Sequence, residues 1–281
     1  MAGLSEMKRR FTPTSLVFGV LGGLLLLDLV LPIANLFLHA DWKGWMVALA
    51  QPGARDAIEV SLAATGISVS IMTVLGVPLG YVLARAALPF KSLWVGLIFL
   101  PMVVPDLAGG ILLLQMYGPY GMIGHALDAR NIELTNNLAG IVLAQLFVAA
   151  PFVIVSSMVG FAGVDRELEQ AAATLGDTRW QIFRDVSLPL AKPSIAAGVT
   201  LAMIRALGEF GATLIMAYNP HSLPVYMWVK FESDGLAGAM PTAFCLVMLA
   251  AAAVALSLLI GRLGGRTDLV TSLTDLGGTS E

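Results

Sequence analysis

Six long apolar segments recur along this chain, and they restrict its fold more than any other feature of the sequence. An α-helix needs about 20 predominantly apolar residues to cross the ~30 Å hydrocarbon core of a bilayer. Segments of this kind occupy residues 15–38, 58–84, 93–117, 138–161, 195–218 and 241–263. They lack the alternation of strands, and lipid offers backbone groups no partners outside a helix or a closed barrel. We therefore predict an all-α integral membrane protein with six transmembrane helices.

The composition agrees with a membrane location. Hydrophobic residues make up 57% of the chain and charged residues 12%, whereas a soluble domain carries about 25% charged residues. The net charge of −3 and the lack of a domain-wide basic face argue against a nucleic-acid partner. The first apolar segment is too long for a secretory signal, so we interpret it as a retained helix. Cys245 is the only cysteine, which excludes an intramolecular disulfide, and we expect no metal site.

The distribution of Lys and Arg predicts the orientation, because cytoplasmic connections of membrane proteins are enriched in these residues. With the N-terminus inside, the cytoplasmic segments hold eleven of them: Lys8, Arg9, Arg10, Arg85, Lys91, Arg166, Arg179, Arg184, Lys192, Arg262 and Arg266. The external segments hold four: Lys43, Arg55, Arg130 and Lys230. Both termini are therefore predicted to be cytoplasmic, and the largest cytoplasmic connection, residues 165–192, joins the fourth and fifth helices.

One transmembrane domain, residues 15–263, accounts for most of the chain. We expect a cytoplasmic N-terminal segment at 1–14 and a flexible cytoplasmic tail at 264–281, which is rich in Gly, Thr, Ser and Asp. External connections are expected at 39–57, 118–137 and 219–240. The last one mixes aromatic and charged residues, which suits either a transient protein interface or anchoring at the lipid headgroups. The two halves of the chain show no convincing similarity, which disfavours many kinds of secondary transporter.

The third apolar segment contains two prolines, Pro101 and Pro105, followed by Gly109 and Gly110. Proline in a membrane helix frees a backbone carbonyl, which must then face protein or water. The segment is therefore expected to bend. The bend could serve helix packing or line a translocation pathway, and the sequence leaves both interpretations open.

Charged residues inside apolar segments are expensive and are functional candidates by default. Arg205 and Glu209 are four residues apart in the fifth segment, so a helix places them on one face. They could form a self-neutralising pair that holds helices together, or they could line the pathway or gate. Asp28 must find a partner, become neutral or face water, whereas Asp106 lies near one end of the third segment and fits an interfacial position.

The connection at 165–192 has the pattern of two short helices joined by a turn. Asp165 is placed to cap the first helix, and Thr178 with Gln181 fits a capping box for the second, which Pro189 is expected to stop. Small residues on one side and bulky apolar residues on the other suggest an element that presents itself to a cytosolic partner. The alternative is an amphipathic helix on the membrane surface, but its mixed charge is unfavourable beside anionic lipid.

This connection resembles the EAA signature of the permeases of binding-protein-dependent ABC importers, in which EAA is followed after three residues by Gly and ends in Ile-x-Leu-Pro. Gln170, Ala171 and Ala172 are in the EAA register, Gly176 is the glycine, and residues 186–189 read Val-Ser-Leu-Pro. The chain departs from the signature at Gln170, which takes the acidic place although Glu169 precedes it, and at Val186.

The resemblance implies a six-helix permease fold with a coupling helix between helices four and five that docks into a cytosolic ATP-binding cassette subunit. The residues expected to couple to that ATPase are Glu169, Gln170, Ala171, Ala172, Gly176, Leu188 and Pro189. It also implies a homodimer, an extracytoplasmic substrate-binding protein, and ATP and Mg on the partner subunit. The chain itself is not expected to be an enzyme, because it contains no Gly-Lys pair and hence no P-loop.

The stretch RALGEFGATLIM, residues 205–216, resembles the fifth-helix signature of the oxyanion branch, which comprises molybdate, tungstate and sulfate permeases. The resemblance implies import of molybdate or tungstate across a prokaryotic cell membrane, with sulfate or thiosulfate as the alternative. Two other readings remain. In a secondary transporter independent of ATP, Asp28, Asp106 and Glu209 would be proton relays, and a membrane anchor or receptor would move nothing.

Overall fold

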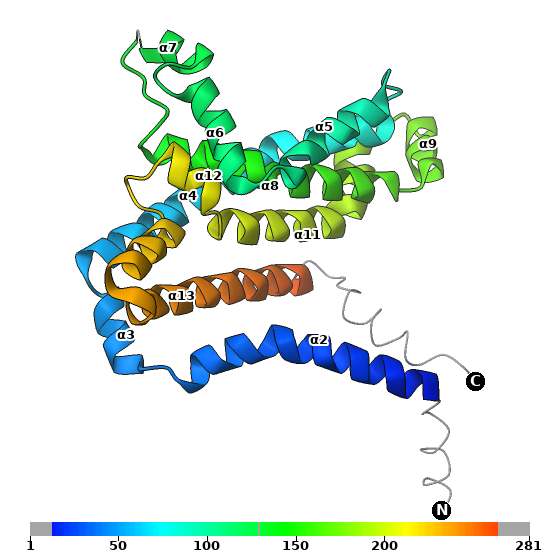
Figure 1. The fold of residues 1–281 in the computed structure, drawn as a ribbon. Helices are drawn as coiled ribbons and strands as arrows, with labels where there is room; N and C mark the ends of the chain where they lie inside the picture. Colours follow the sequence, from blue (N-terminus) through cyan, green and yellow to red (C-terminus); the bar gives the residue numbers. More distant parts are fainter. Residues whose placement is uncertain (1–12, 129, 264–281) are drawn as a thin grey trace, which may run out of the picture. The chain divides into compact units, whose positions relative to one another are not determined.

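The computed structural model describes residues 13–128 and 130–263, and all of its regular elements in that part are helical (Figure 1). The elements are α2 (Pro13–Leu38), α3 (Trp42–Leu49), α4 (Pro52–Arg85), α5 (Lys91–Val103), α6 (Asp106–Tyr117), α7 (Met122–Asp128), α8 (Leu138–Ala162), α9 (Arg166–Thr174), α10 (Arg179–Ile182), η2 (Phe183–Ser187), α11 (Leu188–Leu207), α12 (Gly211–Met216) and α13 (Leu223–Leu263). The predicted tail at 264–281 and most of the predicted segment at 1–14 lie outside the described residues. The all-α prediction is confirmed.

The chain divides into two compact units, residues 1–48 and 49–281. Helix α2 is the long element of the first unit, and its residues from Leu16 to Leu38 are long and apolar enough to cross a membrane. Asp28 lies inside this candidate span. The first predicted transmembrane helix is therefore present with nearly the expected bounds.

The core of the second unit is built where α8 packs against both α4 and α11. Glycines allow these helices to approach closely. A Cβ atom added to Gly80 of α4 would lie 2.9 Å from the Ile154 carbonyl oxygen, and one added to Gly198 of α11 would lie 2.8 Å from that of Phe152. Close approach through small residues is the usual way for membrane helices to gain van der Waals contact, because lipid is as apolar as their side chains.

A buried polar network ties the same three helices together. Gln145 of α8 is only 2% exposed. Its Oε1 accepts a hydrogen bond from Ser68 of α4 at 2.7 Å, and its Nε2 donates to the carbonyl of Ala206 of α11 at 3.0 Å. Hydrogen bonds between helices contribute about 1 kcal/mol each in membranes. They also fix the register of the helices, because a displaced Gln145 would leave polar atoms unsatisfied.

The described residues contain five helices long and apolar enough to cross a membrane, or six if α5 and α6 form one span. The prediction of six spans is confirmed in this form. The third span is broken rather than gently kinked: the helical segments at 91–103 and 106–127 are bent by 111° relative to each other. Pro101 lies inside α5, Val104 is extended, and Pro105 precedes the first residue of α6. An extended residue is what the position before a proline favours.

The fifth span differs from the prediction at both ends. It was expected to run over 195–218 and to follow a helix stopped by Pro189. Instead, η2 carries the chain into α11 at Leu188, and Pro189 lies in the first turn of α11. Proline lacks an N–H and so removes one backbone hydrogen bond from this continuous helical run, which widens into the π-turn η2 just before Pro189. At its other end α11 stops at Leu207, and α12 follows as a separate helix.

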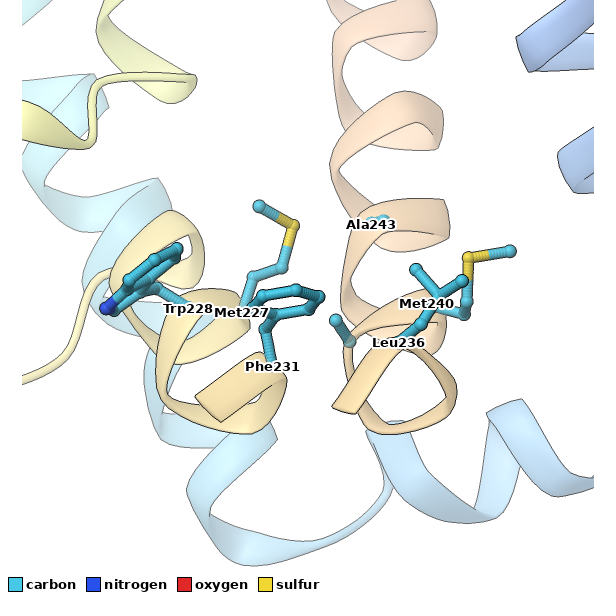
Figure 2. Close-up of a pocket in the computed structure, with 7 residues that line it drawn as sticks. Met227, Trp228, Phe231, Leu236, Met240 and Ala243 are labelled. Atoms are coloured by element: carbon cyan, nitrogen blue, oxygen red, sulfur yellow. The ribbon is translucent and has the colours of Figure 1, made fainter. Parts of the chain in front are cut away.

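The expected external connection at 219–240 is also wrong, because α13 begins at Leu223. The turn formers occupy only the short stretch before it, and the chain then stays helical until Gly235, whose φ of 68° and ψ of −161° interrupt the helix. Glycine adopts this backbone conformation far more readily than other residues. Side chains on both sides of Gly235 line an apolar pocket of about 300 Å³ (Figure 2): Met227, Trp228, Phe231, Leu236, Ala239, Met240 and Ala243.

Candidate functional site

The connection at 165–192 is a folded element with the caps that its sequence predicts. Asp165 Oδ1 accepts a hydrogen bond from the backbone N–H of Glu167 at 2.9 Å at the start of α9. Thr178 and Gln181 form a reciprocal capping box at the start of α10. Such caps satisfy backbone donors that a short helix leaves open. These caps therefore give the connection a defined helical shape.

Gly176 ends α9 in a left-handed conformation, with φ at +97°. The N–H groups of Gly176 and Asp177 donate to the carbonyls of Ala173 and Ala172, the pattern of a Schellman motif. An added Cβ would meet no atom of the chain within 4 Å. A glycine at such a turn can supply a left-handed backbone or allow two surfaces to approach closely. Gly176 supplies the left-handed backbone, and no other part of the chain approaches it closely.

The residues in the EAA register face different sides of α9. Ala172 is buried against the bundle, whereas Gln170 and Ala171 are exposed. Glu169, one residue before the acidic place, turns inward, and its side chain is 17% exposed. The residues with large apolar side chains on the outer side are Leu168, Leu175 and Trp180, which are 50%, 87% and 66% exposed. This end of the unit therefore presents exposed apolar side chains around Gln170, interspersed with exposed charged residues such as Arg166, Glu167 and Arg179.

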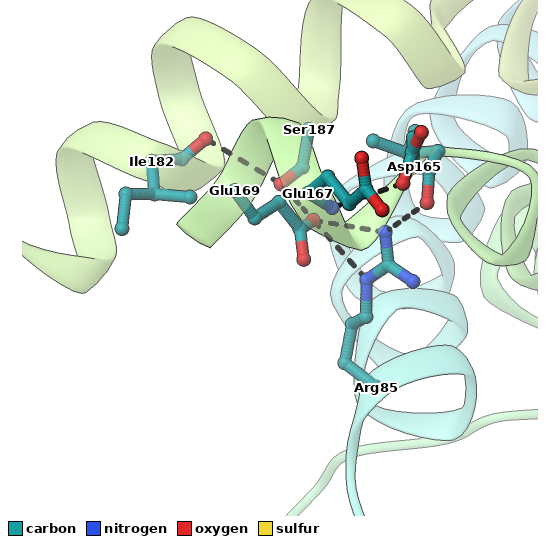
Figure 3. Close-up of polar contacts among 7 residues, drawn as sticks. Arg85, Asp165, Glu167, Glu169, Ile182 and Ser187 are labelled. Atoms are coloured by element: carbon teal, nitrogen blue, oxygen red, sulfur yellow. Dashed lines mark hydrogen bonds and ion pairs between the residues drawn. The ribbon is translucent and has the colours of Figure 1, made fainter. Parts of the chain in front are cut away.

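Glu169 lies at the centre of a compact set of polar contacts (Figure 3). Its Oε1 accepts from Arg85 Nε at 3.1 Å, from Arg85 Nη2 at 2.9 Å and from Ser187 Oγ at 2.6 Å. Arg85 Nη2 also donates to the carbonyl of Val164 at 2.8 Å. Arg85 is the last residue of α4 and Ser187 the last of η2. One carboxylate oxygen thus joins α4, α9 and the start of α11.

Sequence reasoning counted Arg85 only as a cytoplasmic charge and did not single out Ser187. Arg85 is 84 positions from Glu169 along the chain, so no local spacing could reveal the pair. The available signal was weaker: a basic residue in the last turn of a long apolar helix, where cations are favoured by the helix dipole.

An aromatic cluster backs the polar contacts. The ring of Tyr81 of α4 lies 5.1 Å from that of Phe161 of α8 and 4.9 Å from that of Phe183 of η2, centroid to centroid. The exposed Trp180 of α10 stacks on Phe183 at 5.5 Å. Aromatic pairs in such geometries contribute about 0.5–1.5 kcal/mol each beyond the burial of their area. The connection therefore packs against the ends of α4 and α8 and is not a loose loop between helices.

A second ion cluster lies where the third and fifth spans are broken. Arg205 Nη1 contacts Glu209 Oε2 at 2.6 Å, which confirms the predicted pair, and Arg205 Nη2 contacts Asp106 Oδ1 at 2.6 Å. The sequence interpretation missed this second partner. Glu209 has a fully buried side chain, whereas the side chain of Asp106 is 45% exposed. The free oxygen of Glu209, Oε1, accepts from the N–H of Ala212 at 2.8 Å and so caps α12.

Glycines bring the two broken spans together at this cluster. A Cβ on Gly211 of α12 would lie 2.8 Å from the Asp106 Cβ and 2.9 Å from the Leu107 nitrogen, and a Cβ on Gly110 would lie 2.9 Å from the Ala212 Cα. The backbones of α6 and α12 are therefore in direct contact. This contact places Asp106, the first residue of α6, against Arg205.

These features define a polytopic membrane protein with an ion cluster at its broken helices and an exposed connection that is anchored to the ends of its long helices. No group of His, Cys, Asp and Glu in the described part of the chain is arranged to hold a metal ion. The chain belongs to the family of binding-protein-dependent transport system inner membrane components, whose family model matches residues 76–268. It is thus a multi-pass inner-membrane permease component, and ATP hydrolysis is not the function of this family.

The chain is 41% identical over 237 residues to a probable molybdenum ABC transporter permease protein of Haloferax volcanii, covering 84% of this chain and 87% of the relative. It is 38% identical over 259 residues to the molybdate/tungstate transport system permease protein of Thermococcus kodakarensis, covering 91% and 99%. Its fold matches a chain of the inward-facing MetNI methionine ABC transporter with a TM-score of 0.60 and 19% identity, covering 75% of this chain and 95% of that chain. The fold is thus that of ABC importer permeases.

Proposed function

We propose that this chain forms the membrane pathway of an importer for molybdate or tungstate. Two copies pair as a homodimer, a cytosolic ATP-binding cassette dimer binds ATP and Mg, and an extracytoplasmic binding protein delivers the oxyanion. The observation that carries the proposal is the anchored connection at 165–192, which offers exposed apolar and neutral side chains at one end of the bundle. A transporter without an ATPase partner has no use for such a surface.

The coupling residues divide into two groups under this proposal. Gln170 and Ala171 face outward and contact the ATPase, together with the exposed Leu175 and Trp180. Glu169, Ala172, Leu188 and Pro189 hold or continue the connection, and Gly176 sets its turn. Both termini lie in the cytoplasm in this arrangement, in agreement with the excess of Lys and Arg in the segments on that side.

Arg205, Glu209 and Asp106 form the gate of the pathway in this proposal. The cluster holds one positive and two negative charges. A dianion approaching the closed cluster meets carboxylates that already occupy the guanidinium, and like charges close together in a low-dielectric site repel each other strongly. Passage therefore requires Asp106 to leave Arg205. The break at Val104 and Pro105, with Pro101 one turn earlier, makes α6 a separate arm that carries Asp106.

Molybdate and tungstate are proposed as cargo because a relative with 38% identity carries these anions in its name, and a relative with 41% identity carries molybdenum in its name. Sulfate or thiosulfate is the alternative, because sulfate is also a tetrahedral dianion. Arg205 places a positive charge at the broken helices, and this charge alone does not distinguish between such anions.

The test is reconstitution of the chain with its cognate ATPase and binding protein in liposomes. Uptake of molybdate, tungstate, sulfate and phosphate is measured together with ATP hydrolysis. We expect uptake of molybdate or tungstate that depends on ATP and on the binding protein. Preference for sulfate would select the alternative cargo. Uptake by the chain alone, without ATPase, would replace the proposal with a secondary transporter.

A further inference from the structure

We infer that Arg85 and Ser187 are positioning residues for the coupling of ATP hydrolysis to transport, and that they act through Glu169. The inference rests on the proposed function, because it assigns a task to the same connection. Arg85 lies outside the EAA signature, and Ser187 occupies the position of that signature for which no residue type is specified. Through these two side chains, the connection at 165–192 is bonded to the end of α4 and to the start of α11, so that α4, α9 and α11 move together. We call this set of contacts the joint.

The geometry of Arg85 fixes the orientation of α9 as well as its position. The guanidinium donates to Glu169 inside α9 and to the carbonyl of Val164, which precedes that helix. A guanidinium is planar and rigid, so two acceptors on it determine a direction, which a single contact does not. Arg85 is 12% and Glu169 17% exposed, so water competes little for these bonds. Rotation of α9 is therefore passed to the end of α4.

Ser187 provides the second branch of the joint. It is fully buried, and its hydroxyl donates to the same oxygen of Glu169. It closes the π-helical turn η2, in which the N–H of Leu188 donates to the carbonyl of Phe183. A π-turn keeps the backbone hydrogen-bonded between two helical segments, so the chain from α10 into α11 contains no slack loop. A push on α9 or α10 thus reaches α11 both along the backbone and through Ser187.

The branch to α11 leads to the gate cluster, because Arg205 stands near the far end of this helix. From Leu188 to Arg205 the helix rises roughly 25 Å at 1.5 Å per residue. The branch to α4 leads to Gly80 and Ser68, where α4 contacts α8 closely. One movement of the connection at the ATPase therefore displaces both helices that pack against α8.

The test uses the reconstituted complex of this chain with its ATPase and binding protein, and measures uptake per ATP hydrolysed. Arg85→Gln removes the charge and the fork, Arg85→Lys keeps the charge alone, and Ser187→Ala removes one donor. We expect uptake per ATP to fall about tenfold, about threefold and about twofold to threefold respectively, in line with hydrogen bonds to charged groups. Copurification of the ATPase and its hydrolysis rate should stay within twofold of wild type.

The matched control is Arg184→Gln. Arg184 lies in the same connection and also pairs with a carboxylate, Asp185, but the two side chains are 61% and 50% exposed and bridge no elements. This variant should keep wild-type uptake per ATP. An unchanged ratio in Arg85→Gln would overturn the inference, and so would loss of ATPase copurification, which would assign Arg85 to docking.

Failure of both Arg85 variants to fold would also overturn the inference, because the contact would then serve stability alone. Partial recovery in Arg85→Lys, with intact ATPase binding, is the result that a purely structural role would not give. A wild-type complex that imports no oxyanion would contradict the proposed cargo instead. In that case stimulation of ATP hydrolysis by the binding protein still reports coupling, and the same order of variants is expected.

Discussion

Removal of Arg205 should destabilise the protein through Glu209 rather than through Asp106. The change Arg205→Ala leaves two carboxylates without their cation, but they differ in surroundings. Glu209 is fully buried at the break between α11 and α12, whereas the Asp106 side chain is 45% exposed and can be hydrated. A second change that removes the buried carboxylate should therefore relieve the damage, and one that removes the exposed carboxylate should not.

The magnitudes follow from this difference. Stranding a buried member of an ion pair destabilises by about 3–5 kcal/mol, whereas an exposed pair contributes about 0–1 kcal/mol. Glu209→Ala in addition removes the cap on the N–H of Ala212, a loss of about 1 kcal/mol. We expect about 3–5 kcal/mol for Arg205→Ala and for Arg205→Ala with Asp106→Ala. Arg205→Ala with Glu209→Ala should lose only about 1–2 kcal/mol.

The assay is thermal unfolding of the detergent-solubilised protein, followed by fluorescence and size-exclusion chromatography. At about 2–4 °C per kcal/mol for a chain of this size, the double variant without Glu209 should melt roughly 5–8 °C above the other two. Equal midpoints for all three variants would refute the reasoning, because the buried carboxylate would then not be the source of the loss. Rescue by Asp106→Ala instead would show that Arg205 serves mainly to hold α6.

Three further outcomes are expected. Gly176→Val should lose ATPase copurification and coupled uptake while staying inserted in the membrane, because a β-branched residue at φ +97° is strained by at least about 1–2 kcal/mol. Gly176→Asn is the control, because Asn tolerates this conformation, and equal behaviour of the two variants would contradict a role of the left-handed turn in coupling. Exchange of Glu169→Gln with Gln170→Glu should lower uptake at least about fivefold, since it moves the charge from Arg85 to the surface; unchanged uptake would show that the register is unimportant. Asp106→Asn should shift the melting midpoint by less than about 2–4 °C, an exposed-pair effect, yet raise uptake without the binding protein; a tight wild-type-like barrier would exclude Asp106 from the gate.

The spans and the caps could be predicted from the sequence because both are local. Apolar length determines whether a helix can cross the bilayer, and capping depends on residues two or three positions apart, as for Asp165 and for Thr178 with Gln181. The breaks in the fifth and sixth spans could not be predicted in this way. Apolar residues lie on both sides of Glu209, and hydropathy does not show that its carboxylate caps a new helix.

The long-range polar contacts were also beyond the sequence. The i,i+4 spacing gave the Arg205–Glu209 pair, but Asp106 is 99 positions from Arg205 and reaches it only because Gly110 and Gly211 let α6 and α12 touch. In the same way, the Glu169–Arg85 pair depends on where α4 ends relative to α9. Such contacts are set by tertiary packing, and a single sequence offers no periodicity that reports it.

The two ion clusters are built from the same residue types, but their arrangements suit opposite tasks. At the connection, one guanidinium meets one carboxylate; charges balance, both side chains are shielded from water, and every bond ties separate elements together. Little is gained by opening such a site, so it suits a joint that must keep its shape while it moves. At the broken spans, one guanidinium meets two carboxylates, of which one is buried and capped and the other exposed. Here the exposed Asp106 can separate from Arg205 while the pair of Arg205 with the buried Glu209 stays neutral. A gate for anions requires this property.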